Sequence, residues 1–130
     1  MHSDYERLGG EEGLRRIVGD FVDRVFADFI IGFLFIGRDR DRIVQHEIAH
    51  AAEHLGGPRA YAGRPIAQVH RPLPINRGHF RRRLALLRTV LRDHDVDDEI
   101  IDRWIAADKR LEEAVVDGTD CAPPQQGDAV

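Results

Sequence analysis

The sequence predicts a single all-α domain, and three observations carry that prediction. Apolar residues recur at three- and four-residue steps in several segments, which is the spacing of one helix face. No segment alternates apolar and polar residues with a period of two, as a half-buried strand does. The chain has 130 residues, of which 42% are hydrophobic and 32% charged, and this suits one domain with one core.

The first long helix is expected across residues 14–26, where apolar side chains share one face. The members of that face are Leu14, Ile17, Val18, Phe21, Val22, Val25 and Phe26. A dense apolar run follows at residues 29–36. It is short and contains a glycine, so we expect a buried turn or a short helix there.

A second helix is expected from about Arg40 to Leu55. Asp39 or Asp41 can cap its start, and Gly56-Gly57-Pro58 is a common way for a helix to end. Residues 58–75 are rich in glycine and proline. They are predicted to form a loop with at most a short helix near residues 66–70.

Two further helices complete the expected domain. Asn76 can cap one whose apolar face is Phe80, Leu84, Leu87 and Leu91. Asp97 can cap the last, whose inward residues are Ile100, Ile101, Trp104, Ile105, Leu111 and Val115. From Asp117 onward the chain has too few apolar residues to pack, so we expect a folded domain over 1–116 and a disordered tail over 117–130.

Composition excludes several classes of protein. No apolar stretch approaches the ~18 residues of a membrane span, and the start Met1-His2-Ser3-Asp4-Tyr5 has no signal-peptide pattern. The single Cys121 cannot form an intramolecular disulfide, which favours a reducing, cytoplasmic location. A net charge of −4 argues against nucleic acid as a partner. The positive charge is almost all arginine, which we interpret as a composition bias.

Histidine is the informative residue of the second helix. The stretch His46-Glu47-Ile48-Ala49-His50 matches His-Glu-x-x-His, in which two histidines hold zinc and the glutamate is a general base. His54 lies eight residues beyond His46, roughly 12 Å along the axis, too far for all three histidines to share one ion. A zinc hydrolase and a solvated histidine-rich face are therefore the two interpretations of this segment taken alone.

Several short motifs occur in a fixed order along the chain. They are Tyr5-Glu6-Arg7-Leu8-Gly9-Gly10, Phe21 with Asp23-Arg24-Val25, Phe35 after Phe33-Leu34, Leu55-Gly56-Gly57-Pro58, Tyr61-Ala62-Gly63-Arg64, His70 and His79-Phe80. Together, from Tyr5 to about Val116, they resemble the truncated haemoglobins, the small two-over-two helical globins, and most closely group I. The resemblance implies that fold and a haem pocket.

The resemblance places His70 at the family's proximal, iron-binding position. A haem requires apolar walls and one imidazole that can reach iron, and Pro72 and Pro74 would constrain the chain beside His70. The candidate walls are Val22, Phe35, Ile75, Phe80 and Trp104, for each of which ordinary core packing is the alternative. Tyr61 and Arg64 are candidates to reach a haem propionate. The resemblance also implies how the haem is attached: cyanobacterial members can link a late histidine covalently to a haem vinyl, and since no histidine follows His94 here we expect non-covalent haem b.

The distal side departs from the family's usual pattern. Val22 stands where many group I members carry a tyrosine, while Ile43 and Glu47 occupy the neighbouring distal-helix positions. His46 matches the position at which some members bind the iron directly, which implies six-coordinate iron at rest. His50 and Glu47 remain alternatives for the distal site.

The leading functional interpretation is a haem protein that reversibly binds oxygen, nitric oxide or carbon monoxide. An enzymatic alternative is a nitric oxide dioxygenase or peroxidase-like protein, which would need electrons from a separate reductase. A redox or gas-sensing module is a third alternative, and the zinc hydrolase is the fourth. The sequence leaves the physiological ligand, the reductase and the oligomeric state open.

Overall fold

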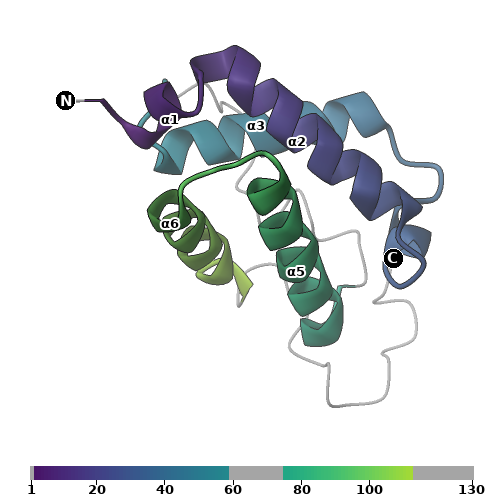
Figure 1. The fold of residues 1–130 in the computed structure, drawn as a ribbon. Coiled ribbons are helices and arrows are strands. Elements are labelled where there is room, and N and C mark those ends of the chain that lie inside the picture. The colour runs from purple at the N-terminus through teal and green to yellow at the C-terminus, as the bar shows by residue number, and fades with distance from the viewer. Residues whose placement is uncertain (1, 59–74, 113–130) are drawn as a thin grey trace.

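Every element of the described residues, 2–58 and 75–112, is helical in the computed structural model. The elements are α1 (Asp4–Arg7), α2 (Gly10–Ala27), the 3-10 turn η1 (Gly32–Phe35), α3 (Arg40–His54), α5 (Arg77–Asp93) and α6 (Asp98–Lys109). α2 packs on α3 and α5 on α6, and contacts of α2 with α5 and of α3 with α6 join the two pairs (Figure 1). The predicted all-α class is confirmed.

The helix boundaries follow from local capping. The Asp39 side chain accepts a hydrogen bond from the Arg42 amide at the start of α3, as predicted. α3 ends before Gly56, whose φ of +87° is a conformation that glycine adopts without strain. Asn76 caps α5 through the amide of His79, also as predicted.

The start of α6 differs from the prediction in its chemistry. Asp97 occupies the position before the helix, but its side chain makes no capping hydrogen bond. Its carboxylate instead accepts a hydrogen bond from Arg7, the last residue of α1. An ion pair with a distant arginine has therefore replaced a local cap.

The four-residue helix α1 was not predicted, although its signal is present in the sequence. Ser3 and Glu6 form a reciprocal capping box. The Tyr5 amide donates to the Leu55 carbonyl at 2.9 Å, so α1 is attached to the end of α3. At the α1–α2 junction the backbones approach so closely that a Cβ on Gly13 would lie 1.8 Å from the Leu8 carbonyl oxygen.

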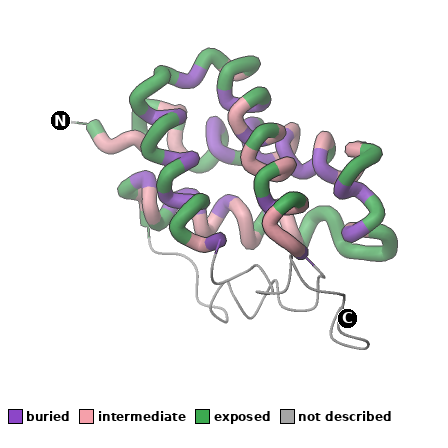
Figure 2. The backbone as a smooth tube through the Cα atoms, turned by 90° about the horizontal axis from the view of Figure 1, so that it is seen from below, coloured by how far each residue is buried: buried purple, intermediate pink, exposed green. Residues whose placement is uncertain are grey.

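The core lies between the two helix pairs, where buried positions face inward from every long helix (Figure 2). The α5 face is as predicted, with Phe80, Leu87 and Leu91 buried and Leu84 partly buried. On α6 the predicted inward residues Ile100, Ile101, Trp104 and Ile105 are all buried.

The prediction that residues 29–36 are a buried turn was only partly correct. A short helix forms there, and Ile31 and Leu34 are buried. Phe29, Ile30, Phe33 and Ile36 are exposed, because a single tight turn directs side chains in all directions and only some can reach the core. Asp28 stabilises the turn, because its carboxylate accepts hydrogen bonds from the backbone amides of Ile30 and Ile31.

Some expectations fall outside the described residues. These are the short helix near 66–70, the inward position of Val115 and the tail over 117–130. Within the described ranges, no helix is both long enough and apolar enough to cross a membrane.

Candidate functional site

A largely buried arginine links three helices. Arg83 on α5 donates to a carboxylate oxygen of Glu47 on α3 at 2.8 Å and to one of Asp108 on α6 at 2.7 Å. The side chains are 16%, 13% and 2% exposed respectively. The guanidinium lies over the rings of Phe21 at 5.1 Å and Phe80 at 5.9 Å, so aromatic faces cover it.

The ion pairs keep Arg83 charged despite its burial. Burial alone would lower its pKa, but the charges of Glu47 and Asp108 outweigh that effect and raise it. Two carboxylates and one guanidinium leave one net negative charge in this part of the core. A buried charge of this kind is tolerated only when its partners are in place.

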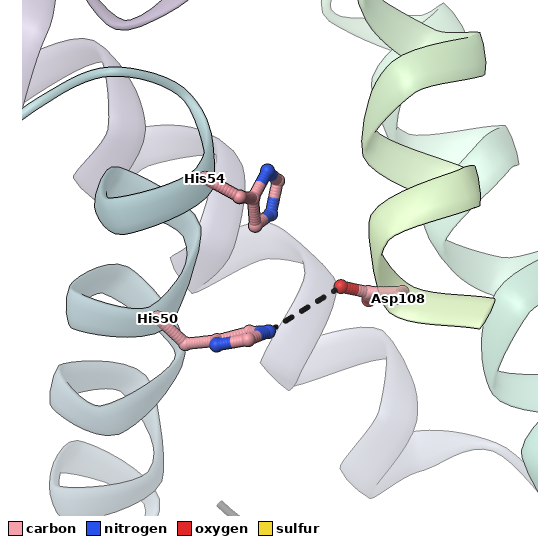
Figure 3. Close-up of side chains that lie close together, drawn as sticks. All are labelled: His50, His54 and Asp108. Carbon is pink, nitrogen blue, oxygen red and sulfur yellow. Dashed lines mark ion pairs between the residues drawn. The ribbon is translucent and has the colours of Figure 1, made fainter. Parts of the chain in front are cut away.

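Two histidines of α3 lie beside the Asp108 carboxylate (Figure 3). His50 Nε2 is 3.8 Å from Asp108 Oδ1, and the His54 ring packs edge-on against His50 and Trp104. Burial lowers the pKa of His54, an effect that the Asp108 charge partly opposes, so its imidazole favours the neutral form. A neutral imidazole is the form that binds a metal or accepts a proton.

The structure brings most of the predicted site residues to the interior. Val22, Ile75, Phe80 and Trp104 are buried, and Phe35 and Ile43 are half-buried. His46, Glu47 and His50 lie half-buried on α3. Tyr61, Arg64 and His70 are outside the described residues.

Sequence reasoning missed three residues of this centre. Arg83 was not distinguished from the other arginines, and interpreting them all as a composition bias was wrong for this one. Asp108 carried no signal, because its role depends on which helix α6 faces. His54 is the third, since only His50 of the pair was a candidate; the four-residue spacing between them places both on one helix face and could have identified His54.

The described residues suit a haem. Val22 on α2 and Phe80 on α5 supply buried apolar surface, and α3 carries the half-buried imidazole of His46. Phe33 is 55% exposed, and its ring meets that of His79 at the start of α5 with 5.6 Å between centroids. An exposed aromatic ring next to the apolar faces of helices is the kind of surface that a flat apolar cofactor covers.

Comparison with known proteins assigns the family. A family model for bacterial-like globins matches residues 3–117. The group 1 truncated hemoglobin GlbN of Mycolicibacterium paratuberculosis is 38% identical over 78 residues, which are 60% of this chain and 57% of that protein. GlbN of Synechocystis is 30% identical over 105 residues, covering 78% of this chain and 85% of that protein.

Solved structures agree in fold. The 2/2 hemoglobin from Synechococcus, in the cyanomet state and with covalently attached heme, superposes with a TM-score of 0.82 at 24% identity. The superposition covers 88% of this chain and 98% of that one. The two-over-two arrangement expected from the sequence is therefore confirmed, and the chain belongs to the bacterial-like globins as a member of the truncated haemoglobin family.

Proposed function

We propose that this chain binds haem b non-covalently and reversibly binds a diatomic ligand, oxygen, nitric oxide or carbon monoxide. The observation that carries the proposal is the half-buried, histidine-bearing face of α3, which packs beside the buried apolar residues of α2. Membership of a globin family supports it. Haem would supply, when bound, an iron centre that can bind a small gas.

Different residues of the chain would bind the haem iron and surround the gas ligand. His70 would hold the iron, and His46 would be a second protein ligand to it when no gas is bound. Val22 offers no hydrogen-bond donor there. Arg83 donates a hydrogen bond to Glu47, so the negative charge of that carboxylate has a counter-charge and its side chain is held in one position.

The remaining pocket assignments complete the proposal. Phe35, Ile43, Ile75, Phe80 and Trp104 would line the pocket. Tyr61 and Arg64 would reach the propionates. Non-covalent attachment is proposed because no histidine follows His94 in the sequence. The 2/2 hemoglobin from Synechococcus, by contrast, has covalently attached heme.

A visible absorption spectrum tests the proximal assignment. The purified chain is expected to show a strong Soret band, and His70→Ala is expected to abolish or grossly weaken haem retention. His2→Ala, at a residue whose side chain is 80% exposed, is the control and should retain the parent spectrum. An unchanged Soret band in His70→Ala would refute the proximal assignment.

The distal assignment is tested with the ferrous protein. His46 on the iron predicts a low-spin, six-coordinate spectrum in both oxidation states. His46→Leu should convert it to a high-spin, five-coordinate spectrum. It should also speed carbon monoxide binding, because no internal ligand has to dissociate from the iron first. His50→Leu should do neither. A parent ferrous spectrum that is already five-coordinate would contradict the role of His46 and leave haem binding intact.

The same preparation separates binding from catalysis. Stopped-flow mixing of the oxygenated protein with nitric oxide tests for dioxygenase activity, and turnover would need electrons from a separate reductase. A protein that only binds would show ligand exchange without catalytic turnover. Cytoplasmic location, inferred from the single Cys121, stays a prediction.

A further inference from the structure

We propose that His50, His54 and Asp108 form a binding site for a divalent transition-metal ion, with Zn²⁺ the best fit, distinct from any haem iron. Two imidazoles and one carboxylate are a common protein donor set for zinc, with a fourth position left for water. The site lies where α3 faces α6 (Figure 3).

The backbone places the three donors around one point. His50 and His54 are one helical turn apart, so their rings lie on the same face of α3, with centroids 5.5 Å apart. Asp108 approaches from α6. One donor atom from each of the three residues lies within 4.8 Å of the other two.

The donors need only a small movement to coordinate an ion. Ligand atoms about 2.1 Å from a tetrahedral Zn²⁺ are roughly 3.4 Å from one another. His50 Nε2 and Asp108 Oδ1 are already 3.8 Å apart. Small rotations of the imidazole side chains that move their donor nitrogens by about 1 Å close the remaining distance, and the backbones of the two helices can stay in place.

Unsatisfied polar atoms are the second, independent observation. His50 Nε2, His54 Nε2 and Asp108 Oδ1 are all buried, and none has a hydrogen-bond partner among the described residues. Buried polar atoms without partners are uncommon, and three that converge are rarer still. A single cation would satisfy all three at once.

The surroundings already orient the donors. The second oxygen of Asp108 accepts from Arg83 at 2.7 Å, which fixes the carboxylate and leaves Oδ1 directed at the histidines. Trp104 packs edge-on against His54 with 5.8 Å between ring centroids. With Glu47 also paired to Arg83, the centre carries one net negative charge, which favours a cation.

This site is different from the one that the His-Glu-x-x-His pattern suggests. That pattern pairs His46 with His50 and uses Glu47 as a base. In the structure Glu47 is bound to Arg83, and the histidine grouped with His50 is His54. The geometry therefore supports a metal site of a different composition and gives no support to the hydrolase arrangement.

Zinc binding by the full-length, haem-loaded protein tests the proposal. Equilibrium dialysis against Zn²⁺, followed by elemental analysis, is expected to give one zinc per chain in addition to iron. His54→Gln and His50→Gln should each weaken zinc affinity at least tenfold. Both keep the Arg83–Asp108 pair, so the variants test the donors without removing the buried counter-charge. His94→Gln is the matched control, since His94 also lies beside a carboxylate, 2.9 Å from Asp20, and should bind zinc as the parent does.

Anomalous diffraction at the zinc edge locates the ion and separates it from iron. Density between α3 and α6 at His50, His54 and Asp108 is the expected result. Absence of stoichiometric zinc in the parent, or zinc that persists in the His50→Gln/His54→Gln double variant, would overturn the proposal. Both results are measured on zinc and not on the Soret band, so the failure of this proposal and that of the haem proposal can be told apart.

Discussion

At the scale of single residues, Arg83 is a charged side chain whose ion pairs join three helices. It forms ion pairs with one carboxylate from α3 and one from α6, and its guanidinium lies over two aromatic rings. Its removal would leave Glu47 and Asp108 buried without a counter-charge. The cost of such an orphaned pair exceeds what the intact pair contributes.

We therefore expect Arg83→Met to lower the free energy of unfolding by about 3–5 kcal/mol, the usual cost of breaking a buried ion pair from one side. Urea unfolding measures it. The triple variant Glu47→Gln/Arg83→Met/Asp108→Asn should recover most of the loss, because no buried charge remains. Arg81→Met, at an exposed position of the same helix, is the control. A loss in Arg83→Met no larger than in Arg81→Met would contradict this account.

Residue-level prediction from the sequence succeeded where the cause is local. The Asn76 cap depends on an amide three residues away, and the sequence contains both partners. Arg83 and Asp108 are 25 positions apart and meet only because α5 packs on α6. Neither hydrophobic periodicity nor a capping pattern predicts such a long-range contact. In a chain with many arginines, the sequence also does not indicate which arginine is buried.

At the scale of elements, one aspartate connects the end of α2 to the middle of α5. Asp28 accepts hydrogen bonds from Nε of Arg82 and from the amides of Ile30 and Ile31. Its side chain is 5% exposed. The hydrogen bond from Arg82 is the main cause that holds the pKa of Asp28 below its ordinary value of 3.8, against the opposing effect of burial.

This lowered pKa predicts a pH dependence of stability. A carboxyl with a depressed pKa in the folded state contributes stability above its unfolded value of 3.8, and that contribution is lost as the pH falls through the folded value. Asp28→Asn should therefore be less stable than the parent at neutral pH, and the difference should shrink as the pH falls below about 4. Urea unfolding at a series of pH values measures this. Asp41→Asn, whose side chain is 82% exposed, is the charge-matched control, and a parent–variant difference that grows toward low pH would contradict the sign.

Helix positions were largely predictable, whereas the segment between α2 and α3 was not. The starts of α3 and α5 follow from the capping side chains of Asp39 and Asn76, and the end of α3 follows from the glycine at 56, all of which act within one turn. In residues 29–36 hydrophobicity alone suggested burial. Which side chains reach the core there depends on the direction of the turn, which Asp28 and Arg82 set from outside the segment.

At the scale of the whole molecule, two helix pairs enclose a core to which each long helix contributes. α3 belongs to one pair and α6 to the other, and the charged centre joins them through α5. The proposed haem would add apolar contacts to this arrangement. A ligand that binds only the folded state raises its stability by mass action.

Removal of haem is accordingly expected to lower the melting temperature of the chain. Calorimetry of the haem-loaded protein and of protein from which haem has been extracted measures the difference, and re-addition of haem should restore the higher value. If His70 holds the iron, His70→Ala should melt close to the extracted parent whether or not haem is supplied. Equal melting temperatures for loaded and extracted parent protein would argue against a haem that contributes to the fold.

The close approach of α1 to α2 also determines which substitutions this sequence tolerates. α2 contains Gly13 and Gly19, six residues apart, and we expect opposite tolerance to alanine at the two positions. A methyl group at Gly13 would clash with the backbone of Leu8. One at Gly19 would have a side-chain nitrogen of Arg40 as its nearest neighbour outside α2, at an ordinary 3.5 Å. Alanine at 19 should raise the unfolding free energy by about 0.5–1 kcal/mol through its better helix propensity. In a saturation-mutagenesis survival screen, position 13 would stay glycine while position 19 would accept alanine freely.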